Sequence, residues 1–206
     1  YTRKAIELNE DLAEAHSNLG GILIDLGNLQ EAELSLRKAI ELKPDFANAH
    51  LNLGNILSDL GKLQEAEFSY HKAIELKPDF ADAHLNLGNI LRDLDKLLEA
   101  ELSTRKAIEI KPNYAEAHYN LGIIFSDMGK LKEAELSTRK AIEIKPDYAE
   151  AHYNLGNILK DTGKSQEAEL STRKAIELKP DYAMAHSNLG NILSDLGKLQ
   201  EAFDSY

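Results

Sequence analysis

The sequence predicts an all-helical solenoid, and three observations support this fold class. A 34-residue unit recurs in register, each unit carries two apolar stripes at helical spacing, and a glycine and a proline close the stripes at fixed places. Residues 1–12 and 183–206 are partial units, so we expect a single solenoid over 1–206 in which each unit contacts mainly its neighbours. The full units align without a gap at 13–46, 47–80, 81–114, 115–148 and 149–182.

The first helix of a unit is predicted from its apolar stripe, and residues 47–80 show it clearly. Ala49, Leu53 and Ile56 fall at helical spacing with Leu60, so they mark a buried face. Gly61 follows the stripe and is predicted to end the helix.

A second helix is predicted from the residues after Gly61, and Pro78 is expected to stop it. Asp79 then comes just before the next first helix and is predicted to be its N-cap. Capping boxes are predicted for Asn113 with Glu116 and for Asp147 with Glu150. The apolar face of this second helix is expected to contain Leu63, Ala66, Phe68, Tyr70, Ala73, Ile74 and Leu76.

Composition excludes several classes of protein. The 206 residues contain no cysteine, so neither a disulfide framework nor a thiolate site for a metal or a nucleophile is expected. The formal net charge of −11 opposes binding to the phosphates of nucleic acid. The chain has no apolar run of about 18 residues and no leader, although a truncated start would hide one, so we expect no membrane role and a cytoplasmic location.

The unit resembles the tetratricopeptide repeat. The resemblance rests on Leu53-Gly54 with Leu57, then Gly61, Ala66, Tyr70, Ala73 and Pro78 at the family's spacing, and it extends over 1–206. It implies antiparallel helix pairs in a right-handed superhelix whose first helices line a groove for peptides or protein segments. Departures are small: a histidine stands early in the first helix, Thr104, Thr138 and Thr172 replace an aromatic residue, and Asp95 replaces a turn glycine.

A row of polar residues on the first helix is the predicted binding surface. Spacings of three, four and seven residues place the row on the face opposite the buried stripe, where we expect its side chains to be exposed. An asparagine amide offers a donor and an acceptor, which is the pairing that a peptide group needs. The asparagines are Asn18, Asn52, Asn86, Asn120, Asn154 and Asn188, followed by Asn55, Asn89, Asn157 and Asn191.

The asparagine row is similar to the ladder in the repeat region of O-GlcNAc transferase, which holds the backbone of an extended polypeptide. The resemblance implies the same role for the six asparagines that stand in an Asn-Leu-Gly context. Two other interpretations remain open at this point: recent duplication of the repeats, and hydrogen bonding of each asparagine to a neighbouring helix.

Aspartates and apolar residues complete the predicted groove. An acidic wall favours a neutral or basic partner segment, unless the aspartates are simply solvated residues near a helix end. The residues before four of the asparagines are expected either to form shallow pockets or to pack against the next first helix. These candidates are Asp25, Asp59, Asp93, Asp127, Asp161 and Asp195 for the wall, and Leu51, Leu85, Tyr119 and Tyr153 for the pockets.

The histidine row is predicted to be structural. Equivalent histidines in adjacent units are expected to lie about 10 Å apart, too far to share a zinc ion that binds nitrogen at about 2.0 Å. No serine, histidine and aspartate set stands apart from the repeat, so we expect neither catalysis nor a cofactor. The row consists of His16, His50, His84, His118, His152 and His186.

These observations favour a protein interaction scaffold that binds an extended polypeptide. One alternative is the substrate-recruiting region of a larger enzyme such as a glycosyltransferase. Another is a consensus-like or engineered repeat without a cognate ligand, because segments such as 103–112 and 137–146 are identical. The partial units at both ends are expected to expose apolar faces that promote end-to-end association.

Overall fold

Helices account for all the regular structure that the computed structural model describes, which covers residues 12–204. These residues fall into two compact units that divide after Ile110, and each unit is described by itself. The predicted all-helical class is confirmed, whereas a single solenoid over 1–206 stays a prediction. Apart from Leu12, the partial repeat at 1–12 lies outside the described residues.

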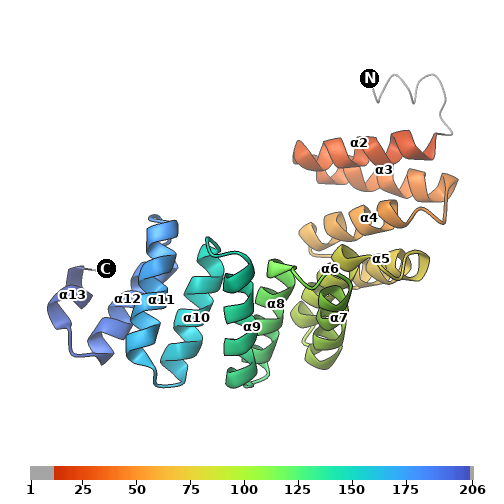
Figure 1. Ribbon diagram of the computed structural model, residues 1–206. Helices are drawn as coiled ribbons and strands as arrows, with labels where there is room; N and C mark the ends of the chain where they lie inside the picture. The colour runs from red at the N-terminus through yellow and green to blue at the C-terminus, as the bar shows by residue number, and fades with distance from the viewer. Residues whose placement is uncertain (1–11, 205–206) are drawn as a thin grey trace. The chain divides into compact units, whose positions relative to one another are not determined.

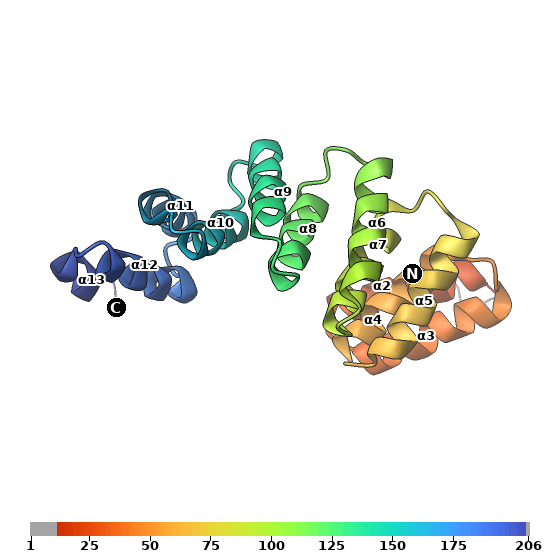
Figure 2. The same cartoon turned by 90° about the horizontal axis from the view of Figure 1, so that it is seen from below.

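The first unit consists of three helix pairs. Each helix packs against the next one along the chain, and the first helices of successive pairs also contact one another, α2 with α4 and α4 with α6. Figure 1 shows the members of each pair lying side by side, and Figure 2 shows the same pairing from below. The helices are α2 (Ala13–Asp25), α3 (Leu29–Leu42), α4 (Ala47–Asp59), α5 (Leu63–Leu76), α6 (Ala81–Asp93) and α7 (Leu97–Ile110).

The second unit repeats this arrangement. Consecutive helices pack on one another, and α10 contacts both α8 and α12. The last helix is short, and side chains are described as far as Ala202. The helices are α8 (Ala115–Asp127), α9 (Leu131–Ile144), α10 (Ala149–Asp161), α11 (Ser165–Leu178), α12 (Ala183–Asp195) and α13 (Leu199–Asp204).

Small residues let the two helices of a pair approach closely. A Cβ atom added to Gly54 would lie 2.6 Å from the Tyr70 ring, so only glycine fits at this crossing. Ala66 and Ala73 on α5 are fully buried in the same contact region. The turn inside the pair depends on a left-handed residue, and Gly61 has a φ of 72°. Asp95 occupies the same turn position in the next pair with a φ of 61°, which costs more for a residue with a Cβ atom.

The predicted N-caps are wrong by one residue. Helix α6 begins after Phe80 and α10 begins after Tyr148, and neither cap side chain bonds the helix. The aromatic rings at these positions pack instead: the Phe80 centroid lies 4.5 Å from the Lys77 ammonium, and the Tyr148 centroid lies 4.9 Å from that of Tyr119. Aromatic packing therefore determines this position, and Asp79, Asn113 and Asp147 lie too early to act as caps.

Phe68 also departs from its prediction. Its side chain is 63% exposed, although the sequence pattern placed it on the buried face of the second helix. Its neighbours Ser69 and Tyr70 turn inward and are buried. Since consecutive helical residues are separated by about 100°, Phe68 cannot share the direction of Tyr70, which lies two residues further on.

Candidate functional site

A cavity of about 190 Å³ in the first unit brings together residues that the sequence singled out. It lies between the first helices α4 and α6, with one residue from α5 at its wall, and we call it the inner cavity. Among the predicted site residues, two aspartates and three asparagines line it. The lining consists of Asn55, Ser58, Asp59, Tyr70, Asn86, Asn89, Ile90 and Asp93.

A hydrogen-bond network fixes two of the asparagines in the inner cavity. Asn55 Oδ1 accepts one hydrogen bond from the Tyr70 hydroxyl at 2.9 Å and another from Asn86 Nδ2 at 2.8 Å. Both lone pairs of this oxygen are therefore used, and the Asn55 Nδ2 group remains as a donor. Asn86 keeps its own Oδ1 as an acceptor, so the network holds a donor and an acceptor on two neighbouring helices.

The charge state of Tyr70 supports this arrangement. Burial raises the pKa of the Tyr70 hydroxyl above its usual value, and the negative charge of Asp59 adds to the effect. The hydroxyl therefore stays protonated at neutral pH and continues to donate to Asn55. Sequence reasoning assigned Tyr70 to the core and missed its polar role; the available signal was a tyrosine where the other four full units have leucine or threonine.

The remaining asparagines of the row differ in exposure. Asn18 is exposed, and Asn52, Asn120 and Asn154 are half-buried, but Asn188 is only 9% exposed, so the predicted exposure is wrong for it. Asn154 Nδ2 donates to Thr138 Oγ1 at 3.5 Å. The residue of the preceding repeat that corresponds to Asn55 is Ile123, whose side chain has no acceptor. Asn188 Nδ2 is buried without a hydrogen-bond partner among the described residues. Of the companion row, Asn157 is half-buried and Asn191 is exposed.

The predicted acidic and apolar candidates differ in exposure. All six aspartates of the predicted wall are exposed. Leu85 is only 5% exposed, which favours the packing alternative over a surface pocket, and Leu51 is half-buried. Tyr119 and Tyr153 are half-buried and pack in tilted pairs against Tyr148 and Tyr182, with ring centroids 4.9 and 5.1 Å apart. Packing against the end of the same repeat thus explains these two tyrosines.

Five histidines of the row, from His50 onward, connect their first helices to the loop before them. His50 Nε2 lies 3.0 Å from the Pro44 carbonyl oxygen, and the same contact to a proline six residues earlier recurs in later units at 2.9 to 3.0 Å. A carbonyl only accepts, so each Nε2 donates, and the contact stabilises the loop. Between residues 12 and 204 no group of three or more histidine or acidic side chains is arranged to hold a metal ion. The helices of this range are also too short or too polar to cross a membrane.

Profiles of tetratricopeptide repeats match most of the chain. Profiles described as tetratricopeptide repeat match residues 47–80, 81–114, 115–148, 149–182 and 172–204, and one described as TPR repeat matches 20–61. The chain belongs to the tetratricopeptide repeat family. Among curated proteins, none matches this tetratricopeptide repeat chain in sequence.

Solved structures give the same fold assignment. YrrB is described as a TPR protein with an unusual peptide-binding site. It is 28% identical in sequence, the match covers 89% of this chain and 95% of YrrB, and the TM-score is 0.71. MamA is 27% identical, with 80% of this chain and 96% of its own covered and a TM-score of 0.72. PilF of Pseudomonas aeruginosa is 20% identical, covers 94% of this chain and 88% of its own with a TM-score of 0.84, and supports the fold alone.

Proposed function

We propose that this tetratricopeptide repeat chain is a non-enzymatic scaffold that binds an extended polypeptide segment through the polar face of its first helices. The observation that carries the proposal is the network of Tyr70, Asn55 and Asn86, which presents one amide donor and one amide acceptor. A peptide group needs this pair of partners, whichever side chain follows it. The described peptide-binding site of YrrB and the resemblance of the asparagine row to the O-GlcNAc transferase ladder support the same function.

The partner segment is neutral to basic in this proposal. Asp59 and Asp93 lie at the inner cavity, where Asp93 pairs with Arg92 Nη2 at 2.9 Å. A lysine or arginine of the ligand gains a favourable contact there, whereas an acidic side chain is repelled. End-to-end association, a cytoplasmic location and the exclusion of nucleic acid remain predictions from the sequence.

Asn55→Asp tests the donor directly. Aspartate keeps an oxygen for Tyr70 and Asn86 but replaces the Nδ2 donor with a second acceptor, so the helix contacts persist and the contact to a ligand carbonyl is lost. Unstructured twelve-residue peptides of alternating Gly and Ser, Gly and Lys, or Gly and Glu serve as probes in calorimetric titration. We expect the neutral peptide to bind the variant about tenfold more weakly, which corresponds to one lost hydrogen bond of about 1.4 kcal/mol.

Leu102→Ala is the control, because Leu102 is 70% exposed on the second helix α7 and lies outside the inner cavity. Its affinity is expected to stay within about twofold of the original chain. If none of the three peptides binds at millimolar concentration, or if Asn55→Asp binds the neutral peptide unchanged, the network serves helix packing alone and the proposal is wrong.

A further inference from the structure

A second and larger cavity lies on the other side of α4 and α5 in the first unit. It has a volume of about 500 Å³, within the range of roughly 300 to 1,000 Å³ that is typical of ligand pockets. Helices α3, α4 and α5 form it, and we call it the outer cavity. Its apolar lining is Ile40, Leu53, Leu57 and Phe68, and its polar lining is Arg37, Glu41, His50, Gln64, Glu65 and Ser69.

The outer cavity is separate from the inner cavity. Helix α4 contributes Leu53 and Leu57 to the outer cavity but Asn55 and Asp59 to the inner one. At about 100° per residue, these two pairs point to different sides of the helix. Changes in one cavity can therefore be made without altering the lining of the other.

Phe68 extends the apolar surface of the outer cavity into solvent. Its ring is 63% exposed, and Leu34, at the same repeat position on the neighbouring α3, is 70% exposed. A large exposed aromatic residue beside an apolar cavity is typical of an anchoring site in protein recognition. A ligand that fills only the cavity would leave most of this surface in water, so a protein segment fits it better than a small molecule.

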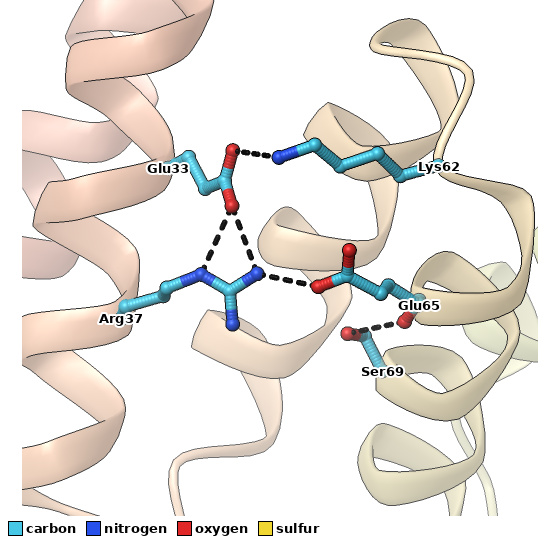
Figure 3. Close-up of polar contacts among 5 residues, drawn as sticks. All are labelled: Glu33, Arg37, Lys62, Glu65 and Ser69. Carbon is cyan, nitrogen blue, oxygen red and sulfur yellow. Dashed lines mark hydrogen bonds and ion pairs between the residues drawn. The ribbon is translucent and has the colours of Figure 1, made fainter.

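Figure 3 shows the ion network that spans from α3 to α5 at this cavity. Arg37 donates through Nε and Nη2 to Glu33 at 3.0 and 2.8 Å, and through Nη2 to Glu65 at 2.7 Å. Lys62 donates to the other oxygen of Glu33 at 2.8 Å. Hydrogen bonds from Lys62 and then Arg37 hold the pKa of Glu33 below its usual value, so the network stays charged at neutral pH.

The charged residues at the edge of the outer cavity, Arg37, Glu41 and Glu65, determine which chemical groups a bound segment needs. Arg37 Nη1 makes no hydrogen bond in the network and offers N–H donors to a peptide carbonyl (Figure 3). Glu65 bonds Arg37 through one oxygen and Glu41 bonds Lys38 through one oxygen, so each carboxylate keeps a second oxygen for a ligand. Arg37, Lys62 and Lys38 balance the charges of Glu33, Glu65 and Glu41, so the rim itself has no excess charge. A cation can still gain directed contacts with the second oxygens of Glu41 and Glu65.

We propose that the outer cavity binds a short segment of a partner protein that has one large apolar side chain next to a lysine or arginine. The apolar side chain packs on Leu53, Leu57 and Phe68. The basic side chain pairs with Glu41 or Glu65, and a backbone carbonyl accepts from Arg37 Nη1. The net charge of −11 of the chain favours such a basic partner over a second copy of the chain itself.

The test uses the whole chain with labelled isoleucine and leucine methyl groups and three acetylated, amidated peptides. The probe is Gly-Lys-Phe-Lys-Gly, and the controls are Gly-Glu-Phe-Glu-Gly and Gly-Lys-Ser-Lys-Gly. We expect the probe to shift the methyl resonances of Ile40, Leu53 and Leu57, and both controls to bind at least about tenfold more weakly. Phe68→Ala is expected to weaken the probe by about five- to tenfold, the loss of one aromatic contact.

Matched variants on α7 control for effects of the outer face in general. Leu102→Ala changes the residue at the repeat position of Phe68, and Glu109→Gln changes the one at the position of Glu41. Like Glu41, Glu109 pairs with a lysine three residues earlier, Lys106, at 2.9 Å. Neither is expected to change probe binding, whereas Glu41→Gln should reduce it about twofold to threefold.

Three results would overturn the outer-cavity proposal. The first is the absence of methyl shifts at millimolar probe, and the second is equal binding of the acidic control or of Phe68→Ala. The third is a set of shifts confined to the neighbourhood of Asn55 and Asn86, which would place the probe in the inner cavity. That last result would still support the proposed function, so the two proposals fail separately.

Discussion

Helix α5 of the first unit and α11 of the second occupy the same place in the repeat but carry different chemistry. They differ at four positions, where Leu63, Phe68, Tyr70 and His71 of α5 correspond to Ser165, Leu170, Thr172 and Arg173 of α11. Phe68 forms a wall of the outer cavity and Tyr70 fixes Asn55 in the inner one. In α11, Arg173 pairs through Nε with Glu169 at 3.0 Å and through Nη2 with Glu201 on α13 at 2.7 Å.

The repeated helical frame and the chemistry of an individual site are therefore separate properties of this chain. Both units use the same glycine and alanine contacts to pair their helices. The ordered asparagine network in the first unit depends on a tyrosine that α11 lacks. Four sets of substitutions test this conclusion.

Asn55→Ala should destabilise the chain by about 2 kcal/mol, because it leaves the Tyr70 hydroxyl and an Asn86 N–H without their acceptor in a partly buried place. Asn157→Ala, at the same repeat position in the second unit, removes no side-chain hydrogen bond to a described residue and should cost less than about 0.5 kcal/mol. Urea unfolding midpoints measure both. Equal losses would mean that the asparagine contributes equally in the two units.

Thr172→Tyr should transfer the network to the second unit. The new hydroxyl replaces a threonine that donates to Ala168 O at 2.8 Å, and it is expected to reach Asn157, which would then accept from the unpartnered Asn188 Nδ2. We expect a gain of about 1 kcal/mol in thermal unfolding and slower exchange of the Asn188 side-chain amide protons. Thr172→Phe is the control: a ring without a hydroxyl that stabilises equally would show that filling space is the whole effect.

Asp95→Gly should stabilise the first unit by about 1 kcal/mol, since Asp95 is held at a positive φ that glycine adopts freely. The reciprocal change, Gly163→Asp, places a Cβ atom on the turn of the second unit at a φ of 75° and should cost a similar amount. Thermal denaturation of the two variants checks the pair. A neutral Asp95→Gly would indicate that the aspartate side chain compensates locally.

His71→Arg should add the link that α11 has, from Glu67 to Glu99 across α5 and α7, and raise stability by about 0.3 kcal/mol at pH 7. The gain depends on charged glutamates. In the existing link, hydrogen bonds from Lys198 and then Arg173 hold the pKa of Glu169 below its usual 4.5.

A carboxylate with a lowered folded-state pKa stabilises fully above its usual value and loses this contribution as the pH falls through the folded value. The His71→Arg gain should therefore persist at pH 6 and vanish well below pH 4.5 in urea unfolding series. A gain that survives strong acid would identify packing of the arginine stem as its source.

The period and the punctuation of the sequence predicted most of the fold. Gly61 and Pro78 flank helices that run over Ala47–Asp59 and Leu63–Leu76, as the apolar stripes indicated. The apolar pattern mispredicted Phe68, which is 63% exposed. The pattern records only that a residue is apolar, so it does not distinguish an aromatic side chain that faces solvent from one that faces the core. The N-cap residues were mispredicted because an aromatic residue occupies the N-cap position. Its ring packs against residues elsewhere in the repeat, as Tyr148 does against Tyr119.

The candidate site was predicted as a row but not as a network. Spacing placed Asn55 and Asn86 on the polar face of their own helices, and both line the inner cavity. Their hydrogen bond joins residues 31 positions apart on different helices, and the orientation of the amide depends on a third helix through Tyr70. Such pairing is set by the packing of the helices in space, which a periodic pattern leaves open.

The glycines of the first helices allow the repeats of this chain to differ from one another. The absence of a Cβ atom leaves room for a side chain of the second helix: Leu36 packs against Gly20, Tyr70 against Gly54 and Thr104 against Gly88. The helix pairing is the same in all three repeats. A duplicated repeat can therefore carry a different residue at this position of its second helix and still pack it against the glycine. Individual copies can therefore differ in ligand chemistry, while the glycine keeps the two helices of each copy in close contact.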